Sequence, residues 1–294
     1  MAKIIAISNQ KGGIGKTTIT KNLGFSLARQ GKKVLLIDFD PQSNLTSGMG
    51  YAKGKKLPIT ITTILSKLIN KQPISVAEGI LTHAEGVDLV PADANLDGME
   101  ARLVNEMARD TFLKRYIETV KQMYDFILVD CPPSINIITI NAYVAATSIL
   151  IPTQASQYSF DGINGALSLK DSVRDSGLNS TLRVEGLIFS IIDGRETTCA
   201  RDYKAEIRET YQEKMKVFDD MIPRAVALEK ADKKGISIFK YDPAATPVEP
   251  FMNIGKEIIE NERKRTEQRD RFRPVVPRGS AGAGNKKPRR YYSV

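Results

Sequence analysis

The sequence predicts an α/β fold, with a mostly parallel, doubly wound sheet flanked by helices. Three continuous apolar runs, at 4–7, 34–37 and 126–129, have the composition of parallel strands that are buried on both faces. Over 19–27, apolar residues recur every four positions, which is typical of an amphipathic helix after the first strand. Acidic residues follow the second and third runs directly. Strands that alternate with helices in this way build an open sheet, whose ligands bind at the carboxyl ends of the strands.

The rest of the first 260 residues continues this alternation. We interpret 43–80 as a surface excursion between strands, because it is polar and interrupted by glycine and proline, and we expect a short helix in it at 62–69. The further predicted elements are strands at 87–91, 148–152 and 184–189 and helices at about 96–107, 111–123, 158–173, 200–211 and 250–265.

Length and composition favour a single large domain, which we assign to 1–260. The chain has 294 residues, of which 41% are hydrophobic, enough for a well-buried core. No apolar run approaches the roughly 18 residues that span a bilayer, and no leader pattern precedes the first strand, so we expect a cytoplasmic protein. Cys131, Cys199 and His83 are too few for a disulfide framework or a metal-hydrolase site.

The net charge of +9 is concentrated at the C-terminus. Residues 261–294 contain eleven Lys/Arg and three Asp/Glu, so this segment carries +8 and the preceding 260 residues only +1. We expect a basic, disordered tail. Such a tail attracts polyanions in a salt-dependent, sequence-independent way, although a solvated tail without a partner has the same composition. The candidate contacts to DNA in it are Lys286, Lys287, Arg289 and Arg290.

A glycine-rich loop joins the first strand to the first helix. It contains Lys11, Gly12, Gly13, Ile14, Gly15, Lys16, Thr17 and Thr18. Glycines let successive backbone N–H groups turn toward phosphate oxygens at a helix start, where the helix dipole also favours negative charge. Lys16 can reach the outer phosphates, and the Thr17 hydroxyl can ligate Mg²⁺. The order and context of these residues predict a nucleotide-binding loop.

The loop departs from the ordinary pattern at its start. Gln10 stands where the first glycine of G-x-x-x-x-G-K-[ST] is usual, and a second lysine, Lys11, follows it. In this form the loop resembles the deviant Walker A motif of the ParA/MinD class of ATPases. The resemblance implies that Lys11 crosses a dimer interface to the nucleotide of the partner subunit. The alternative interpretation of Lys11 is a solvated loop lysine.

Three further segments extend the resemblance over about 1–260. Asp38-Phe39-Asp40-Pro41-Gln42 resembles the D-x-D-P-Q motif of the class, Asp130-Cys131-Pro132-Pro133-Ser134 resembles Walker B, and Ile222-Pro223-Arg224 resembles a segment near the adenine base. The resemblance implies a P-loop NTPase fold with ATP and Mg²⁺ as cofactors. It implies that Asp40 positions or activates the attacking water, that Asp38 and Asp130 hold Mg²⁺ through water, and that Pro223 lies near adenine.

The leading functional prediction is a DNA-partition ATPase of the ParA type. The resemblance implies a homodimer when ATP is bound, non-specific DNA binding and hydrolysis stimulated by a ParB-like protein, with Lys11, Lys16 and Asp40 as the catalytic residues. Candidates for the DNA-binding surface are Arg195 and Arg224. We therefore expect a cytoplasmic, nucleoid-associated protein that does not bind membranes.

Three other functions use a similar loop. A MinD-like membrane-positioning ATPase would need a C-terminal amphipathic helix, and residues 256–273 show no apolar face at helical spacing. A bacterial tyrosine-kinase-like phosphotransferase is suggested only by Tyr291 and Tyr292. A reductase similar to the nitrogenase iron protein would need cysteines that bridge a cluster between subunits, and two isolated cysteines give little support.

Overall fold

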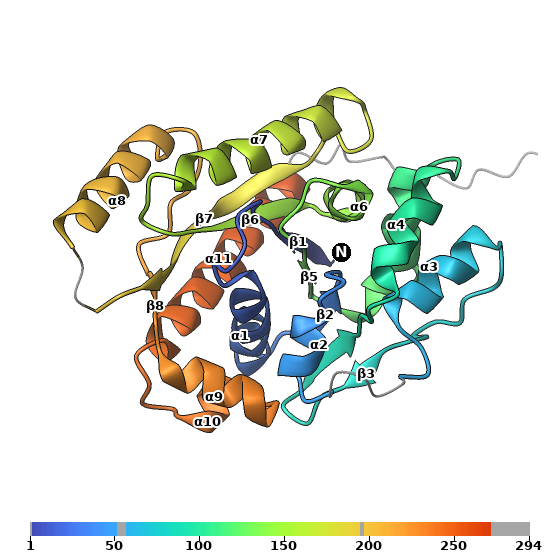
Figure 1. Ribbon diagram of the computed structural model, residues 1–294, viewed down its shortest axis with the longest axis horizontal. Coiled ribbons are helices and arrows are strands. Elements are labelled where there is room, and N and C mark those ends of the chain that lie inside the picture. The colour runs from blue at the N-terminus through green and yellow to red at the C-terminus, as the bar shows by residue number, and fades with distance from the viewer. Residues whose placement is uncertain (1, 52–56, 195–196, 272–294) are drawn as a thin grey trace, which may run out of the picture.

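In the computed structural model, an eight-stranded sheet forms the centre of the protein (Figure 1); the structure describes residues 2–51, 57–194 and 197–271. The strand order is β3-β4-β2-β5-β1-β6-β7-β8, and all neighbouring strands are parallel except β3 and β4. The predicted mostly parallel, doubly wound sheet is confirmed. The strands are β1 (Lys3–Ile7), β2 (Val34–Asp38), β3 (Leu81–Thr82), β4 (Val87–Val90), β5 (Phe126–Asp130), β6 (Ser148–Thr153), β7 (Arg183–Ile192) and β8 (Ile222–Pro223).

Helices cover both faces of the sheet, and each face has its own hydrophobic core. One face carries α1 (Lys16–Arg29), α2 (Asn44–Gly48), α9 (Val226–Lys234), α10 (Ile238–Tyr241) and α11 (Val248–Arg271). The other carries α3 (Ile61–Ile69), α4 (Leu96–Val104), α5 (Phe112–Val120), α6 (Ile137–Ala145), α7 (Ser159–Asp175) and α8 (Thr198–Tyr211), with short 3₁₀ turns at Arg109–Thr111 and Lys121–Met123. The central strands are buried on both sides, which explains their continuous apolar sequences.

The strand register brings the predicted site segments together. Asp130, the last residue of β5, is level with Ile7 at the end of β1 and with Asp38 at the end of β2. The glycine-rich loop follows β1, and the two acidic motifs follow β2 and β5. All three therefore meet at the carboxyl edge of the sheet, where open α/β folds bind ligands.

The segment 43–80 is less peripheral than its composition indicates. Its helices α2 and α3 insert Leu45, Ile61, Ile64 and Leu65 fully into the cores. The helix expected at 62–69 is confirmed as α3. The interpretation as a surface excursion is wrong for these residues, because their apolar side chains stand between polar ones that face solvent.

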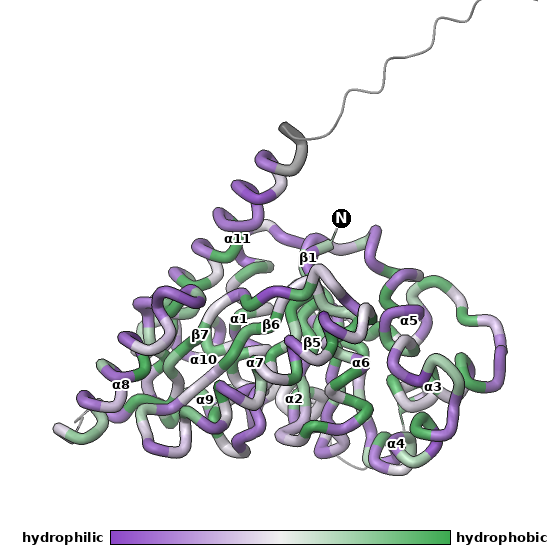
Figure 2. The backbone as a smooth tube through the Cα atoms, turned by 90° about the horizontal axis from the view of Figure 1, so that it is seen from above, coloured by the Kyte–Doolittle hydropathy of each residue, from purple (hydrophilic) through white to green (hydrophobic). Residues whose placement is uncertain are grey.

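Several other boundaries differ from the prediction. The helix expected at 96–107 ends at Val104, and the one expected to stop near 265 continues as α11 to Arg271. Figure 2 shows the C-terminal part of α11 standing clear of the other elements. The helices α9 and α10 and the antiparallel strand β3 were not predicted, because they are short and lack a clear period. Within the described ranges, no helix has the length and apolar character needed to cross a bilayer.

Candidate nucleotide-binding site

The glycine-rich loop is shaped by two left-handed glycines. Gly13 and Gly15 have φ values of 71° and 81°, a backbone conformation that disfavours residues with a Cβ. Gly12 and Gly13 are exposed, whereas Ile14 is buried and its carbonyl accepts a hydrogen bond of 2.6 Å from the Ser190 hydroxyl on β7. The loop is therefore anchored through Ile14, and its glycine backbone remains open to a ligand.

Lys16 begins α1 and closes over the loop. Its side chain is only 7% exposed, and its Nζ donates to the Lys11 carbonyl oxygen at 3.1 Å. Burial lowers the pKa of Lys16, and the negative charge of Asp130 partly opposes this shift. The ammonium group is held beside the loop backbone, where a bound phosphate would supply the missing counter-charge.

Asp130 connects β5 to the start of α1. Its carboxylate accepts hydrogen bonds from the hydroxyls of Thr17 at 2.7 Å and Thr20 at 3.1 Å. The side chain is completely buried, and burial, with a further contribution from the negative charge of Asp38, raises its pKa to about 8. Thr20 was not predicted; its position one helical turn after Lys16 is the only sequence signal for it.

Asp38 is held by α2 rather than by the glycine-rich loop. Its Oδ2 accepts from the Thr46 backbone N–H at 2.7 Å and from the Thr46 hydroxyl at 2.6 Å. Burial raises the pKa of Asp38 to about 6, although the bonds from Thr46 oppose this shift. Asp38 thus orients the segment that contains Asp40, a role that sequence reasoning missed because Thr46 lies in the polar stretch 43–80.

Asp40 lies at the start of that segment and is 7% exposed. Its Oδ1 accepts a hydrogen bond of 2.9 Å from the Gln42 backbone N–H, and its own N–H donates to Asp38 at 3.3 Å. These local bonds fix the carboxylate at the carboxyl edge of β2. The predicted role of Asp40 in positioning or activating water stays a prediction.

The residues at this edge fit a magnesium ion. Thr17 and Asp130 offer hard oxygen donors 2.7 Å apart, and the buried carboxylates Asp38 and Asp130 repel each other without a cation between them. In the described parts of the chain, no three His, Cys, Asp or Glu side chains could hold a metal by themselves. Mg²⁺ in nucleotide sites is generally bound by phosphate oxygens and water with one or two protein ligands.

Lys11 lies against its own chain. Its Nζ donates to the Ser156 hydroxyl at 3.1 Å and stands 6.0 Å from the centre of the Tyr158 ring. Both partners lie between β6 and α7, in a segment for which the sequence gives no motif. The predicted contact of Lys11 with a partner's nucleotide stays a prediction, because the structure contains one chain.

Pro223 and the end of the glycine-rich loop line the same pocket, and the predicted position of Pro223 near adenine stays a prediction. A pocket of about 120 Å³ is lined by Gly15 and Thr18 from the loop side and by Pro223 and Arg224 from the β8 side. Ile191 forms another wall, with a left-handed φ of 55° that is unusual for a β-branched residue. The pocket can accept a flat base next to the phosphate-binding loop.

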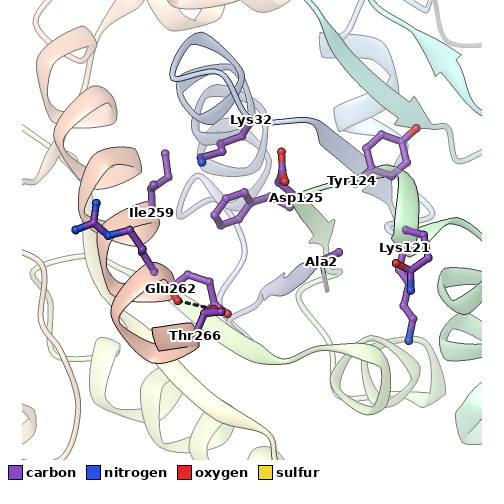
Figure 3. Close-up of a pocket in the computed structure, with 11 residues that line it drawn as sticks. Ala2, Lys32, Lys121, Tyr124, Asp125, Ile259, Glu262 and Thr266 are labelled. Atoms are coloured by element: carbon purple, nitrogen blue, oxygen red, sulfur yellow. Dashed lines mark hydrogen bonds between the residues drawn. The ribbon is translucent and has the colours of Figure 1, made fainter. Parts of the chain in front are cut away.

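The candidate DNA contacts are only partly described. Arg224 is exposed and pairs with Asp193 at 2.7 Å. Arg195, Lys286, Lys287, Arg289 and Arg290 lie outside the described residues. A separate groove of about 430 Å³ lies at the amino ends of β1 and β5, between Tyr124 and Ile259 (Figure 3), and contains none of the predicted site residues.

The fold and this site define a class. A glycine-rich loop that opens a helix with lysine and threonine, next to a buried aspartate at the end of the neighbouring strand, is the phosphate-binding arrangement of P-loop nucleoside triphosphatases. The geometry of the site is sufficient to assign the class of P-loop nucleoside triphosphatases. Comparison with known proteins identifies the family within this class.

Residues 2–184 match the family described as AAA domain. The chain is 39% identical over 261 residues to the sporulation initiation inhibitor protein Soj of Bacillus subtilis, covering 89% of this chain and 100% of the relative. It is 37% identical over 266 residues to the chromosome-partitioning ATPase Soj of Treponema pallidum, covering 90% and 100%. Cobyrinic acid a,c-diamide synthase from Mycobacterium smegmatis, solved with an ATP analog and magnesium, aligns with a TM-score of 0.77, 27% identity and coverage of 89% and 96%. The chain belongs to the ParA/Soj family of P-loop ATPases.

Proposed function

We propose that the protein is a DNA-partition ATPase, which binds ATP with Mg²⁺, dimerises, binds DNA without sequence preference and releases it after hydrolysis. The observation that carries the proposal is the joint presence of a Lys16–Thr17–Asp130 phosphate and metal site and of a second loop lysine, Lys11, close to it. The similarity to Soj proteins, one of which is named a chromosome-partitioning ATPase, supports partition as the process.

The chain's own groups account for ATP hydrolysis. The N–H groups of the glycine-rich loop and the Lys16 ammonium bind the phosphates, and Asp40 orients water for attack on the terminal phosphorus. Thr17 would hold Mg²⁺ directly, and Asp130 and Asp38 would hold it through water. The ion would neutralise charge on the phosphate oxygens. Hydrolysis by a single chain is slow, because Lys16 is the cation that the described residues hold at the loop, while the Lys11 ammonium group is bound to Ser156.

Dimerisation brings a further cation from a second chain. Lys11 leaves Ser156 and reaches the nucleotide of the partner, so that the ATP-bound protein is a homodimer. Its DNA surface includes Arg195 and Arg224, and a ParB-like protein stimulates hydrolysis. These interactions place the protein on the nucleoid in the cytoplasm, and no membrane association is part of the proposal.

The chain divides into an ATPase domain, 1–260, and a basic segment, 261–294, that strengthens DNA binding. Residues 261–271 continue α11 without a break, so the division is one of charge and function rather than of secondary structure. Deletion of 272–294 tests the contribution of the tail, because it keeps every described residue of α11. Unchanged DNA affinity of the truncated dimer would refute it.

Binding of the full chain to a random-sequence DNA duplex tests the proposal. The experiment compares ATP, ADP and no nucleotide across a salt series, with anionic liposomes as a parallel target. We expect ATP-dependent, salt-sensitive DNA binding, which Lys11→Ala abolishes and the exposed-lysine control Lys33→Ala preserves. Liposome binding without DNA binding would contradict the proposal and favour a membrane-positioning ATPase. DNA binding that is the same with ATP, with ADP and without nucleotide would indicate that the tail alone binds DNA.

A further inference from the structure

Helix α7 approaches the start of the glycine-rich loop unusually closely. Gly162 and Gly165 lie in its first two turns, although glycine weakens a helix interior. A Cβ at position 165 would overlap the side-chain amide of Gln10, with Oε1 only 2.7 Å away. A Cβ at position 162 would overlap the Asn9 amide in the same way, with Cγ 3.1 Å away. Two consecutive side chains of the loop entry therefore occupy the space that the two glycines leave free.

These contacts explain the departure of the loop from the ordinary pattern. A glycine is usual at position 10, and this chain has glutamine there. The terminal amide of Gln10 lies in the space that a Cβ at position 165 would fill, so the missing side chain of Gly165 leaves room for this amide against α7. The missing glycine of the loop is thus matched by a glycine on the facing helix.

Asn9, which packs against Gly162 of α7, also binds the backbone of Lys11. Its side chain is 2% exposed and makes two hydrogen bonds, from Nδ2 to the Pro152 carbonyl at 2.7 Å and to Oδ1 from the Lys11 backbone N–H at 3.0 Å. The first bond ties the loop to β6 and the second fixes the backbone of Lys11. Displacing Asn9 by a side chain at 162 would therefore shift Lys11 itself.

The other end of Lys11 is fixed by the same region. Its Nζ donates to Ser156, whose hydroxyl lies 3.0 Å from that of Ser159, the first residue of α7. Ser159 in turn donates to the Gln154 carbonyl. Both the backbone and the ammonium group of Lys11 are thus positioned by the β6–α7 connection and the start of α7.

We propose that Gly162 and Gly165 are positioning residues for Lys11, because they admit Asn9 and Gln10 against α7 and so fix the point from which Lys11 reaches a second chain. This inference rests on the proposed role of Lys11 in the ATP-bound dimer. A Cβ at either glycine would first meet the side chain of Asn9 or Gln10, whereas Thr17 and Asp130 contact each other elsewhere. Lys16 meets this region through its hydrogen bond to the Lys11 carbonyl oxygen. Replacement of the glycines should therefore impair dimerisation more than nucleotide binding by the single chain.

A double-mutant cycle on the full chain tests this inference. Gly165→Ala, Gln10→Ala and the double variant are compared for binding of a fluorescent ATP analogue with Mg²⁺ and for ATP-dependent dimerisation by analytical ultracentrifugation. We expect Gly165→Ala to raise the protein concentration needed for dimerisation by on the order of tenfold, which corresponds to a loss of about 1.4 kcal/mol in the contact with the second chain. Nucleotide binding should change much less, and Gln10→Ala should restore dimerisation by removing the overlapping amide.

Two further variants control for a merely structural effect. Gly98→Ala introduces the same substitution in α4, where a Cβ meets no atom within 4 Å, and should dimerise like the wild type. Asn9→Ala removes the acceptor of the Lys11 N–H without adding an atom to α7, and should reproduce the defect even if Gly165→Ala folds poorly.

The outcomes separate this inference from the proposed function. If Lys11→Ala dimerises normally, the proposed function fails whatever the α7 variants do. If Lys11→Ala fails to dimerise while Gly165→Ala and Asn9→Ala behave like the wild type, only the inference is overturned. It is also overturned if Gln10→Ala does not restore dimerisation to the Gly165→Ala variant, or if nucleotide binding falls together with dimerisation.

Discussion

The two edges of the sheet both bury carboxylates, but they treat them in opposite ways. At the carboxyl edge, Asp130 has hydroxyl partners and a negatively charged neighbour, and its pKa is raised. At the amino edge, Glu185 is surrounded by cations: Lys3 Nζ lies 2.5 Å and Arg265 Nη1 3.0 Å from its oxygens. Burial opposes ionisation of Glu185 too, but the charges of Lys3 and Arg265 prevail and lower its pKa.

This difference separates a site from a structural cluster. The Glu185 cluster is neutralised within the chain and joins β1 and β7 to α11, so its charges need no ligand. In the described parts of the chain, Asp38 and Asp130 form no such ion pair, although the charge of Asp130 acts on the nearby Lys16, and a ligand cation would relieve the repulsion between the two carboxylates. Strongly perturbed groups left without a counter-charge are therefore more informative about function than buried charges as such.

The largest effect is expected for Lys16, the cation at the carboxyl edge of the sheet, whose removal should abolish most ATP hydrolysis. Lys16→Ala should lower the ATPase rate by on the order of a hundredfold or more, because Lys16 provides charge where the phosphates bind. Its thermal unfolding without nucleotide should remain cooperative and close to that of the wild type. Lys33→Ala, at an exposed position, is the control for both measurements. Normal hydrolysis by Lys16→Ala would break the assignment of this edge as the site.

At the amino edge, the main effect should be on stability. Glu185→Gln should lower the free energy of unfolding by about 3 kcal/mol, because it leaves the buried Lys3 ammonium without its main counter-charge. Because the folded pKa of Glu185 is lowered, its stabilisation is complete above its unfolded pKa of about 4.3 and is lost as pH falls through the lower folded value. Urea unfolding at several pH values measures both the loss of unfolding free energy in the variant and the pH dependence of stability. Arg183→Ala removes a half-exposed ion pair with Glu262 and should hardly change the free energy of unfolding. If it lowered this free energy as much as Glu185→Gln does, burial of the Lys3–Glu185 pair would not explain the effect of Glu185→Gln.

Asp130→Asn should act in the opposite direction and stabilise the nucleotide-free protein at pH 8 by about 1–3 kcal/mol. The folded pKa of about 8 exceeds the unfolded value of about 3.9, so the contribution of Asp130 to stability decreases as pH rises between these values. In urea unfolding without Mg²⁺, the free energy of unfolding should decrease less from pH 5 to pH 8 in the variant than in the wild type. The same variant should lose the stabilisation that Mg²⁺ and ATP give the wild type. An unchanged pH dependence would show that Asp130 does not carry uncompensated charge.

The smallest stability effect is expected for an exposed ion pair. Arg224 and Asp193 are paired at 2.7 Å, but their side chains are 61% and 65% exposed. Arg224→Ala should change the free energy of unfolding by less than about 0.5 kcal/mol. It should weaken ATP-dependent DNA binding and reduce its salt dependence, because one phosphate contact is lost. A large loss of stability in Arg224→Ala would show that solvent exposure does not predict how much this ion pair contributes to the free energy of unfolding.

The parts that could be predicted from sequence are those with local signals. The strands β1, β2 and β5 are continuous apolar runs, and the residues that follow them carry recognisable motifs, so both the sheet and the position of Lys16 and Asp130 follow from the sequence. The roles of individual site residues remain predictions.

The missed features depend on contacts between distant residues. Thr46 bonds Asp38, Gly165 admits Gln10, and Lys3 pairs with Glu185 across 182 positions of the chain. None of these residues has an unusual local sequence. A threonine in a polar stretch and a glycine in a helix acquire their meaning only from what the fold places opposite them.

The sheet ends in very short strands on both sides. The outermost strands, β3 and β8, have two residues each, and β3 runs against the direction of its neighbour. Long, flat outer strands are templates on which further chains can add by backbone pairing, and short irregular ones limit this growth. The two terminal strands of this sheet therefore offer few unpaired backbone groups on which another chain could add.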